Sequence, residues 1–316
     1  MIRGLLLLLV GVAFSASLLL PFESLFGIDR GLAISVLVEL RLPRALLALA
    51  YGATLGASGA AIQALFANPL ASPDLTGTTS GAALGAVVTA YLFGFAAPVA
   101  LSIGSVLGAI GALGLLLALA GPKAETATLL LAGLAISALA GALTTLALAL
   151  APSPFAFYDA YDWLMGSLID RSLDQAAFAS LPALVTIALL LWLGPALDRL
   201  SLGEEVAQSL GHDVARLRLK VICLTAFGVG CCVAICGAIG FIGLIAPIFA
   251  RRLTRGHPGR AILPAALIGA LLLLLADLVV RLAPLGRTLP IGVVTALIGA
   301  PFFLWLVAHM RWRLAP

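Results

Sequence analysis

Long apolar runs alternate with short polar segments along the whole chain. The runs fall at about 5–22, 44–66, 79–98, 101–120, 128–151, 177–197, 219–250, 262–283 and 289–308. A helix needs about 20 apolar residues to cross the hydrocarbon core of a bilayer, so each run can form a membrane span. The polar segments are too short for a separate soluble domain. The pattern therefore predicts an all-α membrane protein with a single transmembrane domain over residues 1–316.

The first run has an alternative interpretation as a secretory signal peptide. Arg3 precedes it, and Ala13 to Ala16 resembles a cleavage site. The apolar stretch continues through Phe22, however, and a membrane protein usually keeps its first span. We expect a retained span.

The composition excludes a soluble fold. Hydrophobic residues make up 62% of the chain, charged residues 10%, and the mean hydropathy is +1.18. Soluble domains are about 45–50% apolar and about 25% charged. Transport or chemistry within the membrane is therefore the expected class of function. The four cysteines lie in one apolar run without a CxxC pair, so we expect them to pack as small side chains: Cys223, Cys231, Cys232 and Cys236.

The placement of lysine and arginine constrains the topology, because cytoplasmic loops retain positive charge. If the N-terminus is inside and each run crosses once, the basic residues at 216–220 fall inside and those at 251–260 fall outside. The conflict disappears if the run 219–250 folds back at the glycines of 237–243. This segment is too short for two full spans, so it predicts one full helix, a turn and a shorter helix.

With the fold-back, the chain has about ten helices and both termini are cytoplasmic. Twelve basic residues then lie inside: Arg3, Lys123, Arg199, Arg216, Arg218, Lys220, Arg251, Arg252, Arg255, Arg260, Arg311 and Arg313. Six lie outside: Arg30, Arg41, Arg44, Arg171, Arg281 and Arg287. Glycine pairs at i, i+4 in three runs also predict close helix packing: Gly52 and Gly56, Gly81 and Gly85, and Gly104 and Gly108.

Several segments occur in the order and spacing of a known family. They include Arg41-Leu-Pro-Arg44, Asn68-Pro-Leu-Ala-Ser-Pro-Asp-Leu-Thr-Gly77, Leu129-Leu-Leu-Ala-Gly133, Trp163-Leu-Met-Gly166, Leu202-Gly-Glu-Glu-Val-Ala-Gln-Ser-Leu-Gly211, Gly237-Ala-Ile-Gly-Phe-Ile-Gly-Leu-Ile-Ala-Pro247 and Leu289-Pro-Ile-Gly. From about Arg41 to Trp305 the chain closely resembles the FecCD-type permeases, the membrane subunits of ABC importers for iron-siderophores, haem and cobalamin. One departure is Ile248, where the family usually has histidine.

The resemblance implies the type II ABC importer transmembrane fold, a ten-helix subunit that dimerises around a pore on the dimer axis. The expected partners are a second copy of the chain or a close paralogue, two ATP-binding cassette subunits, a substrate-binding protein and membrane lipid, with no nucleic acid. The expected location is the bacterial cytoplasmic (inner) membrane. An iron-siderophore is the first choice of cargo, and haem or cobalamin (vitamin B12) is the alternative.

The residues themselves exclude a Walker A loop, so ATP, which the resemblance implies as the energy source, is expected on another chain. A Walker A loop requires lysine followed by serine or threonine, but Lys123 precedes Ala124 and Lys220 precedes Val221. We therefore expect no catalytic residue, metal or cofactor on this chain, with ATP and Mg bound by the ATPase.

The segment 202–211 is the candidate ATPase contact. It reads as a short amphipathic helix closed by a glycine, and in FecCD-type permeases the matching loop forms the coupling helices. The alternative is a helix on lipid headgroups, which its acidic pair suits poorly. The predicted contact residues are Leu202, Gly203, Glu204, Glu205, Ala207, Leu210 and Gly211.

Three arginines are expected at the outer face. Arg41 and Arg44 precede a span, and Arg281 ends one. Such arginines often only anchor a helix at the interface. The resemblance implies that they meet acidic residues of the binding protein. Asp277 lies one helical turn before Arg281, so a structural ion pair is the preferred interpretation over a proton or ligand site.

The prolines of 68–74 predict a rigid cytoplasmic turn. By resemblance, Asn68 and Leu70 would form the inner gate together with Glu125 and Thr126. A secondary transporter would need polar groups at the membrane midplane, and Asp277 alone supports this class only weakly. An intramembrane enzyme would need a catalytic cluster within the spans, but the three histidines fall at predicted cytoplasmic ends: His212, His257 and His309.

Overall fold

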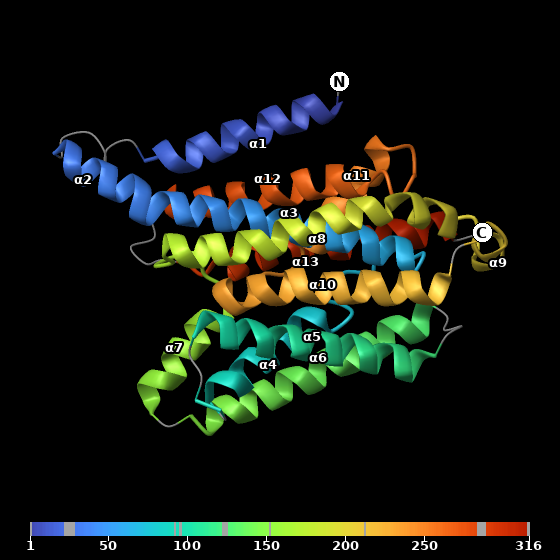
Figure 1. Cartoon of the computed structure of the whole chain (residues 1–316), viewed down its shortest axis with the longest axis horizontal. Coiled ribbons are helices and arrows are strands. Elements are labelled where there is room, and N and C mark those ends of the chain that lie inside the picture. Colours follow the sequence, from blue (N-terminus) through green and yellow to red (C-terminus); the bar gives the residue numbers. More distant parts are fainter. Residues whose placement is uncertain are drawn as a thin grey trace.

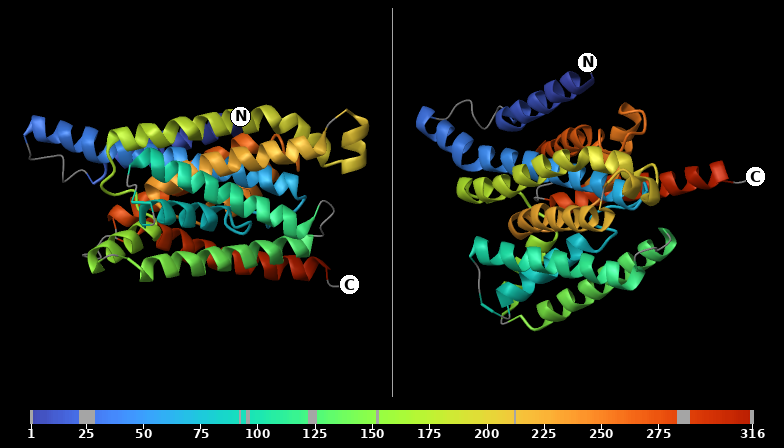
Figure 2. Two further views of the ribbon diagram at one scale, coloured as in Figure 1. Left: turned by 60° about the horizontal axis from the view of Figure 1, so that its bottom comes forward. Right: turned by 45° about the vertical axis from the view of Figure 1, so that its right-hand side comes forward.

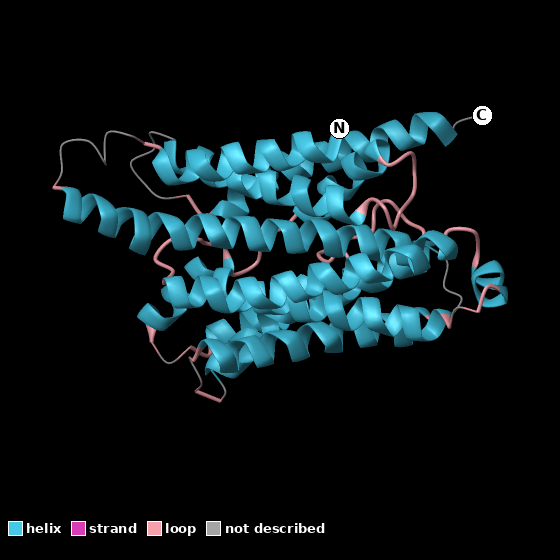
Figure 3. Ribbon diagram, turned by 45° about the horizontal axis from the view of Figure 1, so that its top comes forward, coloured by secondary structure: helices cyan, strands magenta, loops and turns pink. Residues whose placement is uncertain are grey.

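The computed structural model describes residues 2–21, 29–91, 93–94, 97–121, 126–151, 153–211, 213–282 and 289–314. Within these ranges the chain forms helices and no strand, as Figure 3 shows. The elements are α1 (Ile2–Leu19), α2 (Arg30–Ser35), η2 (Val36–Arg41), α3 (Leu42–Leu65), α4 (Thr78–Tyr91), α5 (Pro98–Ala120), α6 (Thr126–Ala149), α7 (Pro154–Leu164), α8 (Leu173–Leu200), α9 (Glu204–Ser209), α10 (Val214–Cys236), α11 (Ile242–Leu253), α12 (Ile262–Leu282) and α13 (Ile291–Leu314). The predicted all-α architecture is confirmed.

The long helices run side by side in one bundle. Helices α4 to α6 form one side, α1 and α12 lie on the opposite side, and α10 packs between α5 and α3 (Figures 1 and 2). Helix α9 and the C-terminus lie at one end of the bundle, and α2 and α7 lie at the other (Figure 1). Among the residues that the structure describes, five segments are long and apolar enough to cross a membrane: α5, α8, α10, α12 and Leu131–Ala149 of α6.

The predicted fold-back after α10 is confirmed. Helix α10 has 23 residues and ends at Cys236, and α11 resumes at Ile242 with only 12 residues. At about 1.5 Å per residue α11 is too short to cross a bilayer. Its last turn carries Arg251 and Arg252 towards the end of the bundle that holds α9 (Figure 1). The two basic clusters therefore lie on one side, as their charge requires.

Three features differ from the sequence-based expectation. The π-helical turn η2 joins α2 directly to α3, and α7 forms a helix at the end of the bundle opposite α9, where the sequence predicted no helix. Helix α4 has only 14 residues, fewer than the run 79–98 suggested. The run is apolar enough for a span. The irregular segment 66–77, which precedes α4, forms the first part of this crossing in place of a longer helix.

The glycine pairs pack where they were expected. Gly52 and Gly56 of α3 lie against Gly269 and Ala265 of α12, and Gly81 and Gly85 of α4 face Gly104 and Gly108 of α5. The backbones approach so closely that no side chain fits between them. Cys231, Cys232 and Cys236 are buried in α10, where they pack as small side chains.

Candidate functional sites

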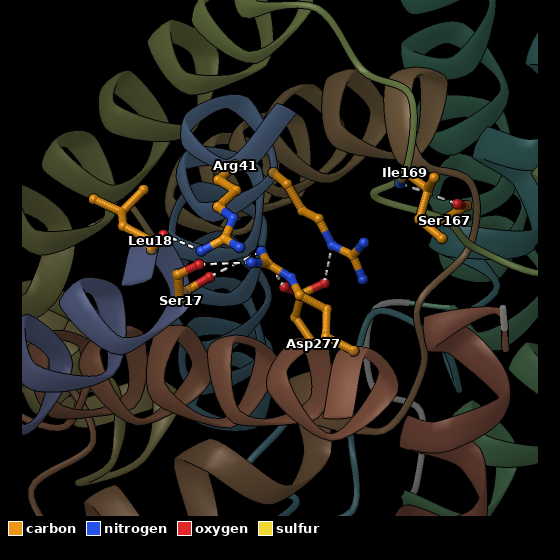
Figure 4. A network of polar contacts seen from close by, with 8 residues as sticks. Ser17, Leu18, Arg41, Ser167, Ile169 and Asp277 are labelled. Carbon is orange, nitrogen blue, oxygen red and sulfur yellow. Dashed lines mark hydrogen bonds and ion pairs between the residues drawn. The ribbon is translucent and has the colours of Figure 1, made fainter. Parts of the chain in front are cut away.

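The end of the bundle that holds α2 and α7 contains a cluster of arginines around one buried acid. Arg44 lies in the first turn of α3, and Asp277 and Arg281 lie one turn apart on α12. Asp277 is completely buried and accepts hydrogen bonds from Arg44 Nε at 2.5 Å and Arg281 Nη2 at 2.8 Å (Figure 4). The predicted Asp277–Arg281 ion pair is confirmed, and Arg44 joins it.

The same cluster holds the end of α1. Arg281 Nη1 donates to the carbonyl of Ser17 at 2.6 Å, and Arg41 Nη1 donates to the carbonyl of Leu18 at 2.7 Å (Figure 4). Arg41 Nη2 reaches the carbonyl of Pro21 at 3.0 Å. The last carbonyls of a helix lack partners within the helix, so these arginines cap the C-terminus of α1.

All three predicted docking arginines therefore lie together, and each makes contacts within the chain. Arg41 is 7% exposed, and the side chains of Arg44 and Arg281 are 15% and 9% exposed. Three cations around one carboxylate leave the cluster positively charged. Docking of a binding protein stays a prediction, because these internal contacts neither require nor exclude it.

A second acid lies inside the bundle, and sequence analysis missed it. Asp74 Oδ1 accepts a hydrogen bond from Thr79 Oγ1 at 2.7 Å, and Oδ2 accepts one from the backbone N–H of Phe241 at 2.9 Å. Its backbone carbonyl accepts from Ser137, which lies at the middle of α6, at 3.3 Å. Asp74 thus joins the segment before α4 to the break between α10 and α11.

The expectation of a cytoplasmic turn over 68–74 is therefore wrong for its second half. Residues 72–77 enter the bundle to the depth of Ser137 instead of staying at its end. The sequence signal was a proline-rich polar turn, and no local feature shows how deep such a turn lies. Irregular backbone at that depth must be covered by protein or line a cavity. A cavity of about 160 Å³ lies there, lined by Ser72, Asp74, Leu75, Gly240, Phe241, Leu244 and Phe303.

Tyr51 supports the other side of the break. Its hydroxyl lies in the buried middle of α3, where it donates to the carbonyl of Gly237 at 3.1 Å and accepts from the N–H of Ile239 at 3.3 Å. Phe241 has a left-handed backbone at φ 66° and packs its side chain against Gly299 of α13. The unpaired backbone groups that end α10 and begin α11 are thus bound by side chains from α3 and from the segment before α4.

The predicted gate residues are placed only in part. Asn68 is buried, and its Oδ1 accepts a hydrogen bond from the N–H of Leu70 at 2.9 Å, which fixes the turn. Leu70 is partly exposed. Thr126 begins α6, and Glu125 lies outside the described residues. The gate role of all four stays a prediction.

The predicted coupling segment forms α9, which covers Glu204–Ser209. Glycines with positive φ flank it, Gly203 at 110° and Gly211 at 82°. Ala207 is buried, whereas the apolar side chains of Leu202, Val206 and Leu210 are 63%, 44% and 56% exposed.

Within the chain, Glu204 pairs with Arg218 of α10 at 2.7 Å. A groove of about 680 Å³ separates α9 from the end of α3.

Comparison with known proteins agrees with this geometry. Residues 1–309 match the FecCD transport family. The chain belongs to this family. It is therefore a multi-pass permease subunit, and its role is transport.

Two curated FecCD relatives span most of the chain. The vitamin B12 import system permease protein of Vibrio cholerae is 41% identical over 285 residues, covering 86% of this chain and 82% of the relative. The Fe(3+)-citrate import system permease protein of Bacillus subtilis is 38% identical over 286 residues, covering 90% and 85%.

A solved structure confirms the expected ABC importer permease fold. It is described as an inward-facing conformation of a metal-chelate type ABC transporter, and it superposes with a TM-score of 0.85 at 36% identity. The match covers 98% of this chain and 99% of that chain.

Proposed function

We propose that this chain is the membrane-spanning subunit of an ABC importer that translocates an iron-siderophore or a related metal chelate. The observation that carries the proposal is the FecCD match over residues 1–309, supported by relatives that serve Fe(3+)-citrate and vitamin B12 import. Cobalamin or haem is the alternative cargo, and the Vibrio cholerae relative favours cobalamin among these.

The proposed assembly contains two membrane subunits, identical or closely related, two ATPase subunits and a substrate-binding protein. ATP and Mg bind to the ATPase, and this chain hydrolyses no ATP. We place it in the bacterial inner membrane with both termini cytoplasmic. The support is the charge distribution, because the basic clusters near α9 and at the end of α11 lie at the same end of the bundle.

Helix α9 is the proposed contact for the ATPase. Its support is an apolar surface of Leu202, Val206 and Leu210 that no described part of the chain covers. Exposed apolar side chains of this kind favour a protein partner. Glu204 and Glu205 lie in its first turn and add a charged edge.

The contact is tested with E204K/E205K in the assembled transporter. The double variant should hydrolyse ATP with little uptake, because two charges reverse at the contact. The control D159K/D162K reverses two exposed charges of α7 at the opposite end of the bundle and should transport normally. Normal coupling in E204K/E205K would refute the contact.

The proposed docking surface for the binding protein is the arginine cluster at the outer end. Its support is the net positive charge of Arg41, Arg44 and Arg281 around Asp277. Charged patches steer association and make it sensitive to salt. Reversal of charge in R41E/R44E should abolish stimulation by the binding protein.

We also keep Asn68, Leu70, Glu125 and Thr126 as the proposed inner gate.

Reconstitution tests the function as a whole. Proteoliposomes with this chain alone should show neither ATP hydrolysis nor uptake. Addition of the ATPase and binding protein should give ATP-dependent uptake of radiolabelled ferric siderophore, with cyanocobalamin and haem assayed in parallel. Uptake by the chain alone, driven by a proton gradient, would overturn the ABC assignment.

A further inference from the structure

Within the described part of the chain, Arg44 uses one of its donor groups. Its Nε donates to Asp277, whereas Nη1 and Nη2 donate to no residue in the part of the chain that the structure describes. The Arg44 side chain is 15% exposed, and neither atom is a buried donor without a partner, so this edge reaches solvent. A guanidinium can bind a carboxylate through its Nη1–Nη2 edge while its Nε holds another group. Arg44 therefore has a free edge for a second carboxylate.

Asp277 fixes the position of Arg44 and cannot itself be reached. Its carboxylate is completely buried, and its second oxygen is held by Arg281 Nη2 at 2.8 Å. Arg281 in turn donates to the carbonyl and the hydroxyl of Ser17, so α1 fixes the guanidinium group of Arg281. The carboxylate is thus held from two sides, and Arg44 is held against it from α3 (Figure 4).

We propose that Asp277 is a positioning residue for docking: it orients Arg44 so that the Nη1–Nη2 edge receives an acidic side chain of the binding protein. This inference rests on the proposed docking function. An oriented guanidinium loses less conformational freedom when the partner binds, so Asp277 tightens the complex although it is an anion in a surface that binds anions.

The sign of the effect separates positioning from simple charge attraction. Replacing Asp277 by asparagine makes the outer cluster one charge more positive, so charge attraction alone predicts faster and tighter association with an acidic partner. Positioning predicts weaker binding. Asparagine has one acceptor oxygen, and its amide group would face the second arginine as a donor, so only one of the two arginines keeps its partner.

The experiment measures association and dissociation of the binding protein on the complete transporter in lipid nanodiscs. The probe is the binding protein that supports uptake by the wild-type complex. In D277N we expect Kd to rise about tenfold, mainly through faster dissociation. The control D174N removes an exposed acid in the first turn of α8 and should leave Kd unchanged or slightly lower. Tighter binding of D277N would overturn the proposal.

A second variant keeps the test valid if D277N fails to fold. In R44K the charge is unchanged, but lysine has no second edge and cannot hold Asp277 and present a fork together. We expect R44K to weaken binding by about tenfold. The control R30K changes an exposed arginine in α2 and should bind like wild type. Wild-type binding by R44K would contradict the positioning role.

The outcomes distinguish the docking function from the positioning role of Asp277. If R41E/R44E leaves binding unchanged, the docking function itself is wrong. If R41E/R44E abolishes binding while D277N binds as tightly as D174N, docking stands and positioning by Asp277 is wrong.

Discussion

Gly59 is the point where α3 meets the start of α11. A Cβ added there would lie 2.7 Å from the carbonyl carbon of Gly243 and 3.0 Å from its Cα, whereas ordinary contacts are 3.4–4 Å. The neighbouring atoms belong to the backbone and cannot rotate away. The substitution G59A therefore requires α3 and α11 to move apart. Because α11 begins directly after Phe241, the movement would also disturb the bond to Asp74.

The magnitude follows from two opposing effects. Alanine in place of glycine favours a helix by about 1 kcal/mol, and overpacking a close contact costs about 1–3 kcal/mol. Gly111 of α5 supplies a matched control, because a Cβ there would have no neighbour within 4 Å. G111A should keep the gain without the cost. Both variants keep the helix gain, so we expect G59A to be less stable than G111A by the overpacking cost alone, about 1–3 kcal/mol.

Thermal unfolding of the purified chain in detergent measures this difference. The unfolding midpoint of G59A should lie below that of wild type, and the midpoint of G111A should not. ATP-dependent uptake by the reconstituted complex should fall only in G59A. An unfolding midpoint of G59A equal to or above that of G111A would refute the claim that α3 and α11 are packed too closely for a methyl group.

Two further substitutions test the support of the break between α10 and α11. D74N should fold like wild type, because its oxygen can accept from the N–H of Phe241 while its amide donates to the hydroxyl of Thr79. D74L should leave both groups unpaired, so its yield of monodisperse protein in size-exclusion chromatography should fall. Equal yields of the two would contradict these hydrogen bonds. Y51F removes the donor to the carbonyl of Gly237 and should lower the free energy of unfolding by about 1–3 kcal/mol, measured by denaturant titration; an unchanged value would argue against that contact.

Local sequence information was sufficient for the long helices and for the fold-back. Apolar runs fix helices because backbone groups in lipid must bond within the segment. The basic residues on both sides of the run 219–250 fixed its return, because both clusters must face the same side. The Asp277–Arg281 pair was also accessible, because four residues span one helical turn. Arg44 joins that pair from another helix, and no spacing rule connects positions 44 and 277.

The sequence by itself determined the membrane class, the family and the return of the chain between α10 and α11. These depend on composition, charge and short motifs, which are local properties. Only the tertiary structure decided that 72–77 enters the bundle, that Asp74 and Tyr51 hold the break before α11, and that Arg44 shares Asp277 with Arg281. The physical reason is common to all three. A polar side chain inside a membrane bundle is stabilised by a partner, and that partner comes from whichever distant helix packing brings within hydrogen-bond distance.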